Sequence, residues 1–129
     1  MTDIAARITR RPIPFDPTAG NDIRDTFADL GPEVAELLAG TAGCSPFLKG
    51  LMGREADWLR QALETAPEAA REEVLSGLSE VPLDGLGAAL RIAKRRLALL
   101  TAVCDLGGLW PLEEVTGTLT RLADKAVDL

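Results

Sequence analysis

Two segments near the C-terminal end decide the fold. Residues 85–106 read GLGAALRIAKRRLALLTAVCDL, and residues 111–129 read PLEEVTGTLTRLADKAVDL. Apolar residues recur in both at alternating steps of three and four, which is the heptad spacing of packed helices. They are Leu86, Leu90, Ala93, Leu97, Leu100 and Cys104 in the first segment, and Leu112, Val115, Leu119, Leu122, Ala126 and Leu129 in the second. The short connection Gly107–Pro111 predicts that the two helices form an antiparallel hairpin.

The upstream chain also has helical spacing and almost no alternation typical of strands. We expect breaks at Gly31-Pro32, Gly40–Gly43, Gly53, Pro67 and Val81-Pro82, with short helices between them. Among these helices, one begins at Ser45-Pro46, because serine is a preferred N-cap and proline a preferred first helical residue. The sequence thus predicts an all-α helical bundle. Its central member is the helix at 85–106, which has a second apolar edge formed by Ile92, Leu99, Val103 and Leu106.

The first twenty residues differ from the rest. Three prolines lie between positions 12 and 17, and proline disfavours a helix both at its own position and at the preceding residue. We expect residues 1–20 to form an extended, proline-rich arm and residues 21–129 to form a single helical domain. Ile13 and Phe15 are predicted to anchor the arm to this domain, with Arg7, Arg10 and Arg11 facing solvent.

Composition excludes several classes of function. The chain of 129 residues has no histidine and a net charge of −6, and its two cysteines are 60 positions apart. Histidine-based nucleophilic pairs are therefore absent, no zinc or redox dithiol spacing is present, and nucleic acid is not an expected partner. The sequence contains neither a run long enough to cross a membrane nor a typical secretion signal, so we expect a cytoplasmic protein.

Arg91, Lys94, Arg95 and Arg96 form the single basic cluster in the sequence. On a helical wheel Arg91, Lys94 and Arg95 lie opposite the apolar arc, where they form either a solvated face or a ridge that binds an anion or a partner. Arg96 falls inside the arc. We expect its stem to be buried and its guanidinium to form a structural ion pair with a carboxylate, while the other three side chains are exposed.

The remaining candidates favour structural roles. Cys44 precedes a helix start that would lower its pKa, but with no activating histidine we expect a small buried side chain. Cys104 is expected in the core, and Trp58 and Trp110 are expected to be core residues or interhelix wedges. Adjacent acidic pairs such as Glu113-Glu114 diverge by 100° around a helix and cannot share a metal. No set of residues predicts a catalytic, cofactor-binding or metal site.

The order and spacing of several short motifs resemble the N-terminal region of the bifunctional glutamine synthetase adenylyltransferase/adenylyl-removing enzymes. The resemblance covers nearly the whole chain. It rests on CSPFL at 44–48, Trp58-Leu59, Leu90-Arg91 with KRR at 94–96, DLGGLWPLEEVT at 105–116, and Leu122-Ala123-Asp124.

The resemblance implies a bacterial enzyme of nitrogen metabolism with two nucleotidyltransferase-like halves. One half attaches AMP from ATP to a tyrosine of glutamine synthetase, and the other, N-terminal half removes it by phosphorolysis, under the control of PII proteins and glutamine. ATP and Mg²⁺ are expected only for the full-length family enzyme. The metal-binding motif of the two halves has the form G-G followed by S-D-x-D. Here Gly107-Gly108 is followed by Leu109-Trp110-Pro111, so no catalytic residue is carried over to this chain.

Three interpretations of function remain. The first is a non-catalytic helical scaffold that packs on a following nucleotidyltransferase domain of the same polypeptide, with glutamine synthetase or PII as further partners. The second is a stand-alone helical adaptor or homodimer that associates through open heptad surfaces of residues 85–129. The third is an anion or nucleotide binder that uses Arg91, Lys94 and Arg95.

Overall fold

The chain forms eight α-helices across residues 4–128, which are the residues that the computed structural model describes. No strand occurs among them, and the predicted all-α fold is confirmed. The helices are α1 (Ile4–Arg7), α2 (Pro17–Thr26), α3 (Pro32–Cys44), α4 (Pro46–Arg54), α5 (Ala56–Glu64), α6 (Pro67–Leu78), α7 (Leu86–Leu106) and α8 (Leu112–Asp128), with short 3-10 turns at Ala28–Leu30 and Leu83–Gly85.

Local chemistry explains where several helices begin. Proline is the first residue of α2, α3, α4 and α6, where its missing N–H costs no helical hydrogen bond. The Ser45 hydroxyl accepts a hydrogen bond from the backbone N–H of Leu48 at 3.2 Å and so caps α4. Asp16 caps α2 in the same way through the N–H groups of Thr18 and Ala19. The predicted helix start at Ser45-Pro46 is confirmed.

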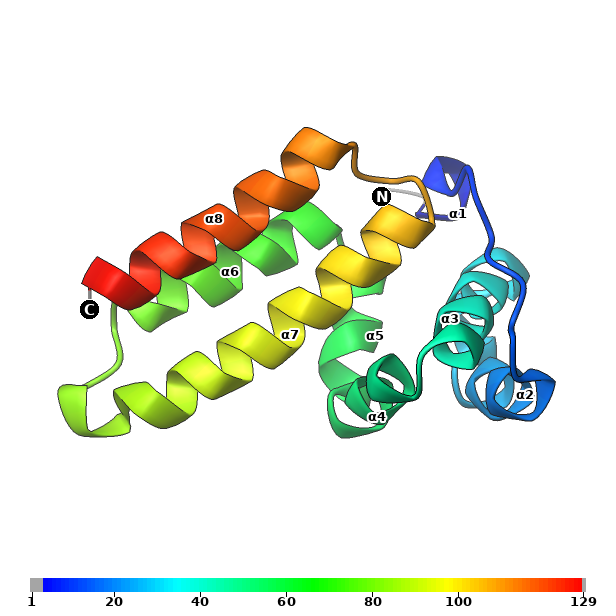
Figure 1. Ribbon diagram of the computed structural model, residues 1–129, viewed down its shortest axis with the longest axis horizontal. Coiled ribbons are helices and arrows are strands. Elements are labelled where there is room, and N and C mark those ends of the chain that lie inside the picture. The colour runs from blue at the N-terminus through cyan, green and yellow to red at the C-terminus, as the bar shows by residue number, and fades with distance from the viewer. Residues whose placement is uncertain (1–3, 129) are drawn as a thin grey trace.

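The predicted hairpin is present, and α7 is its central member. Helices α7 and α8 run antiparallel, and α6 lies alongside both (Figure 1). Every cluster of buried apolar side chains includes residues of α7: Leu99 and Val103 in one, Leu100 and Cys104 in the second, and Ala93 and Leu97 in the third. This one helix therefore joins the N-terminal helices to the hairpin.

The heptad seam predicted for α8 is wrong in part. Leu112 and Leu119 are 72% and 45% exposed, whereas Thr118 and Leu122 are buried. The physical reason is that α8 contacts α6 as well as α7, which turns the Thr118 side of the helix inward. Arg71 of α6 donates a hydrogen bond to the Thr118 hydroxyl at 3.3 Å. An apolar stripe is left on the outside of α8. Leu129 lies outside the described residues.

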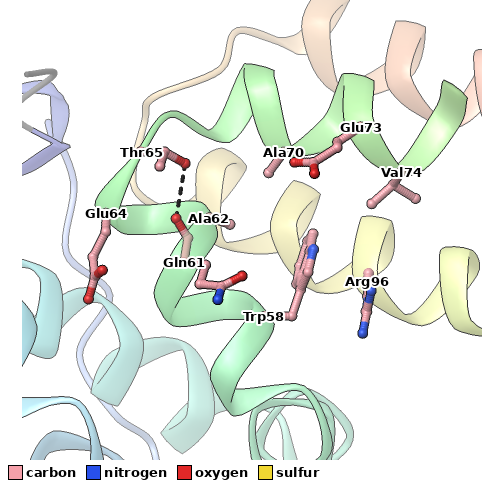
Figure 2. Close-up of a pocket in the computed structure, with 9 residues that line it drawn as sticks. All are labelled: Trp58, Gln61, Ala62, Glu64, Thr65, Ala70, Glu73, Val74 and Arg96. Atoms are coloured by element: carbon pink, nitrogen blue, oxygen red, sulfur yellow. Dashed lines mark hydrogen bonds between the residues drawn. The ribbon is translucent and has the colours of Figure 1, made fainter. Parts of the chain in front are cut away.

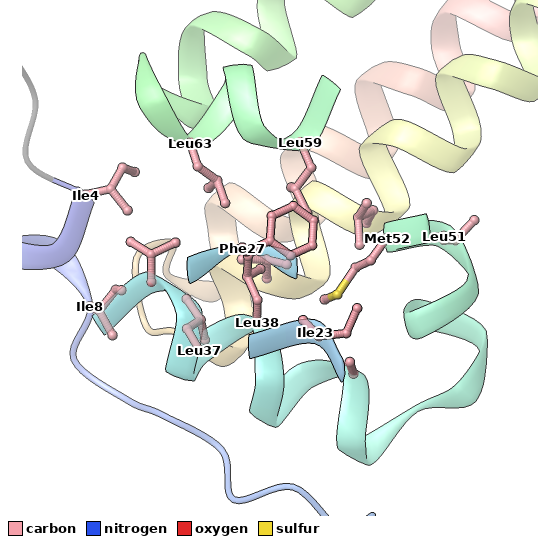
Figure 3. Close-up of a cluster of buried hydrophobic side chains, with 14 residues drawn as sticks. Ile4, Ile8, Ile23, Phe27, Leu37, Leu38, Leu51, Met52, Leu59 and Leu63 are labelled. Carbon is pink, nitrogen blue, oxygen red and sulfur yellow. The ribbon is translucent and has the colours of Figure 1, made fainter. Parts of the chain in front are cut away.

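The N-terminal helices enclose the largest apolar core. Phe27, Leu38 and Met52 are completely buried there, and Leu59 of α5 closes the core from another side (Figure 3). Burial of a large apolar side chain contributes about 1.5–3 kcal/mol, so this cluster is a major source of stability. The core fixes α5 against α7, and the junction between α4 and α5 therefore has a defined position.

The N-terminal segment differs from the extended arm that we expected. Residues Ile4–Arg7 form α1, and α2 begins at Pro17, so the extended path covers only residues 8–16. The predicted anchors are wrong, because Ile13 and Phe15 are 86% and 92% exposed. Alternation places Pro12 and Pro14 on the inner side, against α3. Ile13 and Phe15 therefore face solvent.

The predicted break at Gly40–Gly43 is also wrong, because α3 continues through both glycines. A Cβ atom added at Gly40 would lie 1.9 Å from the carbonyl oxygen of Pro12, and one at Gly43 would lie 2.3 Å from Cβ of Pro14. The glycines thus permit the extended segment to pack directly on the helix backbone. The break expected at Gly53 lies one residue before the end of α4 at Arg54, and α5 begins at Ala56, so that break is confirmed to within two residues.

Cys44 is exposed, and the expectation of a buried side chain is wrong. Its Sγ donates a hydrogen bond to the carbonyl oxygen of Ile13 at 3.3 Å, because the extended segment crosses the end of α3 at this point. Cys104 lies in the core as expected, and burial raises the pKa of its thiol to about 12.

Candidate interaction site

One carboxylate organises the centre of the molecule. Glu55 lies at the junction of α4 and α5, and only 7% of its side chain is exposed. Nε of Arg96 donates to its Oε1 at 2.6 Å, and Nη2 of Arg95 donates to its Oε2 at 3.2 Å. The two arginines come from α7, so this cluster of three charges ties the α4–α5 junction to the central helix.

The structure separates the four cations of the basic cluster into two pairs. Arg91 and Lys94 are exposed, in line with their place on the helical wheel. Arg95 was expected beside them, but its side chain is only 34% exposed and contacts Glu55. The wheel gives the direction of a Cβ atom, whereas a long arginine side chain can curve by several ångströms towards a buried carboxylate. The expectation of an exposed Arg95 is therefore wrong.

Arg96 makes a second contact, with an aromatic ring. Its guanidinium carbon lies 5.5 Å from the ring centroid of Trp58, within the range of a cation–π interaction. The side chain is 35% exposed, and only its Nε takes part in the hydrogen bond to Glu55. Trp58 is half-buried and packs against two core clusters, which agrees with an interhelix wedge.

A groove runs along this cluster, with α6 on one side and helices α5 and α7 on the other. Its main hollow has a volume of about 470 Å³, with Trp58 and Arg96 on one side and Glu73 and Val74 of α6 on the other (Figure 2). A second hollow of about 240 Å³ shares three of these residues and extends to Gly77, Val81 and Ile92. The two hollows form one groove that is polar at the α5 end and apolar at the other end.

A second charged network secures the opposite end of the hairpin. Arg7 of α1 donates two hydrogen bonds to Glu68 of α6, the shorter at 2.7 Å, and the indole N–H of Trp110 donates to the same carboxylate at 2.5 Å. The hydrogen bond from Arg7 is the largest cause that holds the pKa of Glu68 at about 2, far below its ordinary value. Arg71 packs over the Trp110 ring at 5.1 Å and pairs with Glu114.

The sequence alone does not identify these partners. Trp110 is buried as expected. A buried indole N–H requires a hydrogen-bond acceptor, and this requirement is the one signal in the sequence that points to a partner such as Glu68. No equivalent signal marked Glu55, one of many carboxylates in an acidic chain. Within residues 4–126 no group of three metal-binding side chains comes together. None of the helices described is long and apolar enough to cross a membrane.

Comparison with known proteins identifies the family. Residues 34–129 match the family described as Glutamate-ammonia ligase adenylyltransferase. The chain belongs to this family. It is 33% identical to a bifunctional glutamine synthetase adenylyltransferase/adenylyl-removing enzyme of Rhodopseudomonas palustris, with 99% of this chain aligned to 15% of that protein.

Other relatives give the same result. A protein with this description from a Bradyrhizobium species is 31% identical over 98% of the chain, and one from Caulobacter vibrioides is 38% identical over 67%. The alignments cover 15% and 9% of those two proteins, so the chain corresponds to a small part of its much longer relatives. No solved structure matches it.

Proposed function

We propose that this chain is a non-catalytic helical scaffold of an enzyme that adds adenylyl groups to glutamine synthetase and removes them. The observation that carries the proposal is the alignment of 99% of the chain with only 15% of a bifunctional relative. In such a protein the catalytic groups lie in the remaining length, and the helical part packs against a nucleotidyltransferase domain. ATP and Mg²⁺ then bind outside this chain.

The arrangement of charge supports a scaffold role. The carboxylates of Glu55 and Glu68 are each held by arginine, and Glu72 is held by Arg71 and Arg121. A catalytic metal needs carboxylate oxygens that are free to bind it, and these three are engaged in joining helices. The role of the ion pairs is to fix the orientation of α6, α7 and α8.

Two assays test the proposal. The purified chain is expected to transfer no AMP to glutamine synthetase, to remove none, and to show no micromolar affinity for Mg-ATP by calorimetry. The remaining part of the R. palustris relative is then assayed with and without the chain. The chain is expected to raise its activity or thermal stability. AMP transfer by the chain alone contradicts the proposal.

The exposed leucines of α8 favour a second candidate function. Leu112 and Leu119 lie seven residues apart and share one outward face, as in a helix that pairs with another chain. In a homodimer, or in a stand-alone adaptor bound to its partner, the other chain would cover this face. Sedimentation at increasing concentration tests it: a monomer at high concentration excludes the homodimer, and a dimer that dissociates in Leu119→Glu supports it. Contacts with glutamine synthetase or PII are further proposals, tested by pull-down with the purified proteins.

A further inference from the structure

The groove between α6 and α7 is lined by apolar side chains that this chain does not cover. Ile92 of α7 is 37% exposed, and it lines the same hollow as Val74 and Val81. Helix α8 does not cover them, because it contacts a different side of α6, where Arg121 pairs with Glu72 and Lys125 donates to Ser79. Gly77 adds open space, since a Cβ atom there would meet nothing within 4 Å.

The two rims of the groove carry opposite charge. On the α7 side Arg96 lines the hollow, and only its Nε takes part in the hydrogen bond to Glu55. Arg95 and Arg96 share the single carboxylate of Glu55. This rim therefore has an excess of positive charge in a chain whose net charge is −6. On the α6 side Glu73 is exposed and forms no ion pair in the described structure.

We propose that this groove is the docking site of an amphipathic helix supplied by another part of the same long polypeptide, an inference that rests on the proposed scaffold function. The apolar side of that helix fills the space between Val74 and Ile92. A carboxylate on one flank meets the free guanidinium nitrogens of Arg96, and a lysine or arginine on the other flank meets Glu73. Helix-in-groove recognition combines an apolar face with flanking charges that fix orientation.

The symmetry of the contact favours this occupant over a second copy of the chain. A second copy would insert its exposed Leu112–Leu119 face into the groove, and that contact joins two different surfaces. Contacts between different surfaces do not close in a dimer and lead to rings or open chains. A helix of the same polypeptide avoids this outcome. It also reaches the groove at a high effective concentration.

The first experiment blocks the groove. The chain is titrated calorimetrically with the R. palustris relative from which the aligned 15% has been removed, and that aligned segment serves as the positive control. Gly77→Leu places a side chain in the groove and is expected to weaken binding at least tenfold. Gly50→Leu is the matched control: it also replaces a helical glycine in open space, but Gly50 does not line the groove, so affinity stays unchanged.

The second experiment reverses the charge of the rim. Glu73→Lys is expected to weaken binding several-fold in low salt and to reduce its dependence on salt concentration. Glu113→Lys is the control, because Glu113 is exposed on α8 and does not line the groove. Circular dichroism and thermal unfolding establish that each variant is folded.

The outcomes separate the two proposals. Equal affinity of Gly77→Leu and the unaltered chain overturns the groove and leaves the scaffold function in place. Failure of the unaltered chain to bind, when the positive control binds, overturns both. If the chain self-associates and Gly77→Leu abolishes this self-association, a second copy occupies the groove. That result overturns the proposed helix of the same polypeptide as its occupant.

Discussion

Helices α2–α5 surround Phe27, Leu38 and Met52, whose side chains are completely buried, whereas α8 contacts its neighbours through Thr118, Leu122 and charged pairs. In the first region most large apolar residues lie inside, although Phe47 is 68% exposed. In the second, Leu112 and Leu119 face outward, and arginines join the helices. The first region has a fully buried core that is completed by Leu99 and Val103 of α7, whereas the second leaves Leu112 and Leu119 exposed.

The largest expected difference in stability is between two leucine-to-alanine substitutions, one in the N-terminal core and one in the hairpin. Leu38→Ala in the N-terminal core is expected to lower the free energy of unfolding by about 3–5 kcal/mol, because it leaves a cavity in a completely buried cluster. Leu122→Ala in the hairpin is expected to cost about 2 kcal/mol, because Leu122 borders solvent and the site can collapse. Urea unfolding measures both. Equal losses would show that the two cores are equally closed.

The extended segment provides a second test of close packing in the N-terminal region. Gly40→Ala is expected to destabilise by about 2–3 kcal/mol, since its Cβ atom would overlap the Pro12 carbonyl group and neither backbone can yield easily. Gly117→Ala in α8 is the control. Its Cβ atom meets open space, and alanine raises helix propensity, so stability rises by up to about 1 kcal/mol. A neutral Gly40→Ala would mean that the segment is readily displaced.

The glycines show what the sequence could and could not predict. Helix starts such as Ser45-Pro46 depend on neighbours in the chain, so a single sequence suffices to locate them. The role of Gly40 depends on contact with Pro12, 28 positions away, and local rules interpret such a glycine as a break. Periodicity similarly located α8, but its rotation is decided by α6, which contacts α8 and turns Leu112 and Leu119 outward.

The candidate site was predictable to a similar extent. Position on the helical wheel marked Arg96 as a residue that needs a carboxylate, and the structure places it beside Glu55. The identity of that carboxylate, and the convergence of Arg95 on it, depend on how α4 and α5 pack on α7. The groove itself arises between helices that are adjacent only in the folded chain, and no pattern within one helix indicates it.

The charges around Glu55 are expected to be strongly coupled. Arg96→Met and Arg95→Met each leave Glu55 with one cation, so each is expected to cost about 1 kcal/mol. The double variant leaves a nearly buried carboxylate unpaired and is expected to cost about 3 kcal/mol or more. A double-mutant cycle by urea unfolding measures the coupling. Additive losses would show that the two arginines stabilise the fold independently, and a large loss for Arg96→Met alone would show that Arg95 does not compensate for it.

The Glu68 network predicts a pH dependence of stability. The pKa of Glu68 is about 2 in the folded chain, compared with an ordinary value of 4.5, so folding favours the ionised form. Its contribution is complete above about pH 4.5 and is lost as the pH falls towards 2. Because 36% of the Glu68 side chain is exposed, solvent screening reduces the energy involved, and a small effect is expected. Glu68→Gln, measured by thermal unfolding between pH 6 and about pH 2.5, should reduce this part of the acid destabilisation.

The smallest change in the free energy of unfolding is expected for substitution of Cys44. The exposure of the two thiols is opposite to the contrast between the regions. The Cys44 thiol is exposed although it lies beside the better-closed core, whereas Cys104 is buried at the end of the hairpin. Cys44→Ser should therefore change the free energy of unfolding by less than about 0.5 kcal/mol. A thiol reagent should label only Cys44 in the native chain, because burial keeps Cys104 protonated and out of reach. Labelling of both thiols at equal rates without denaturant would show that α7 and its connection to α8 open readily, and that the hairpin is looser than its charged pairs imply.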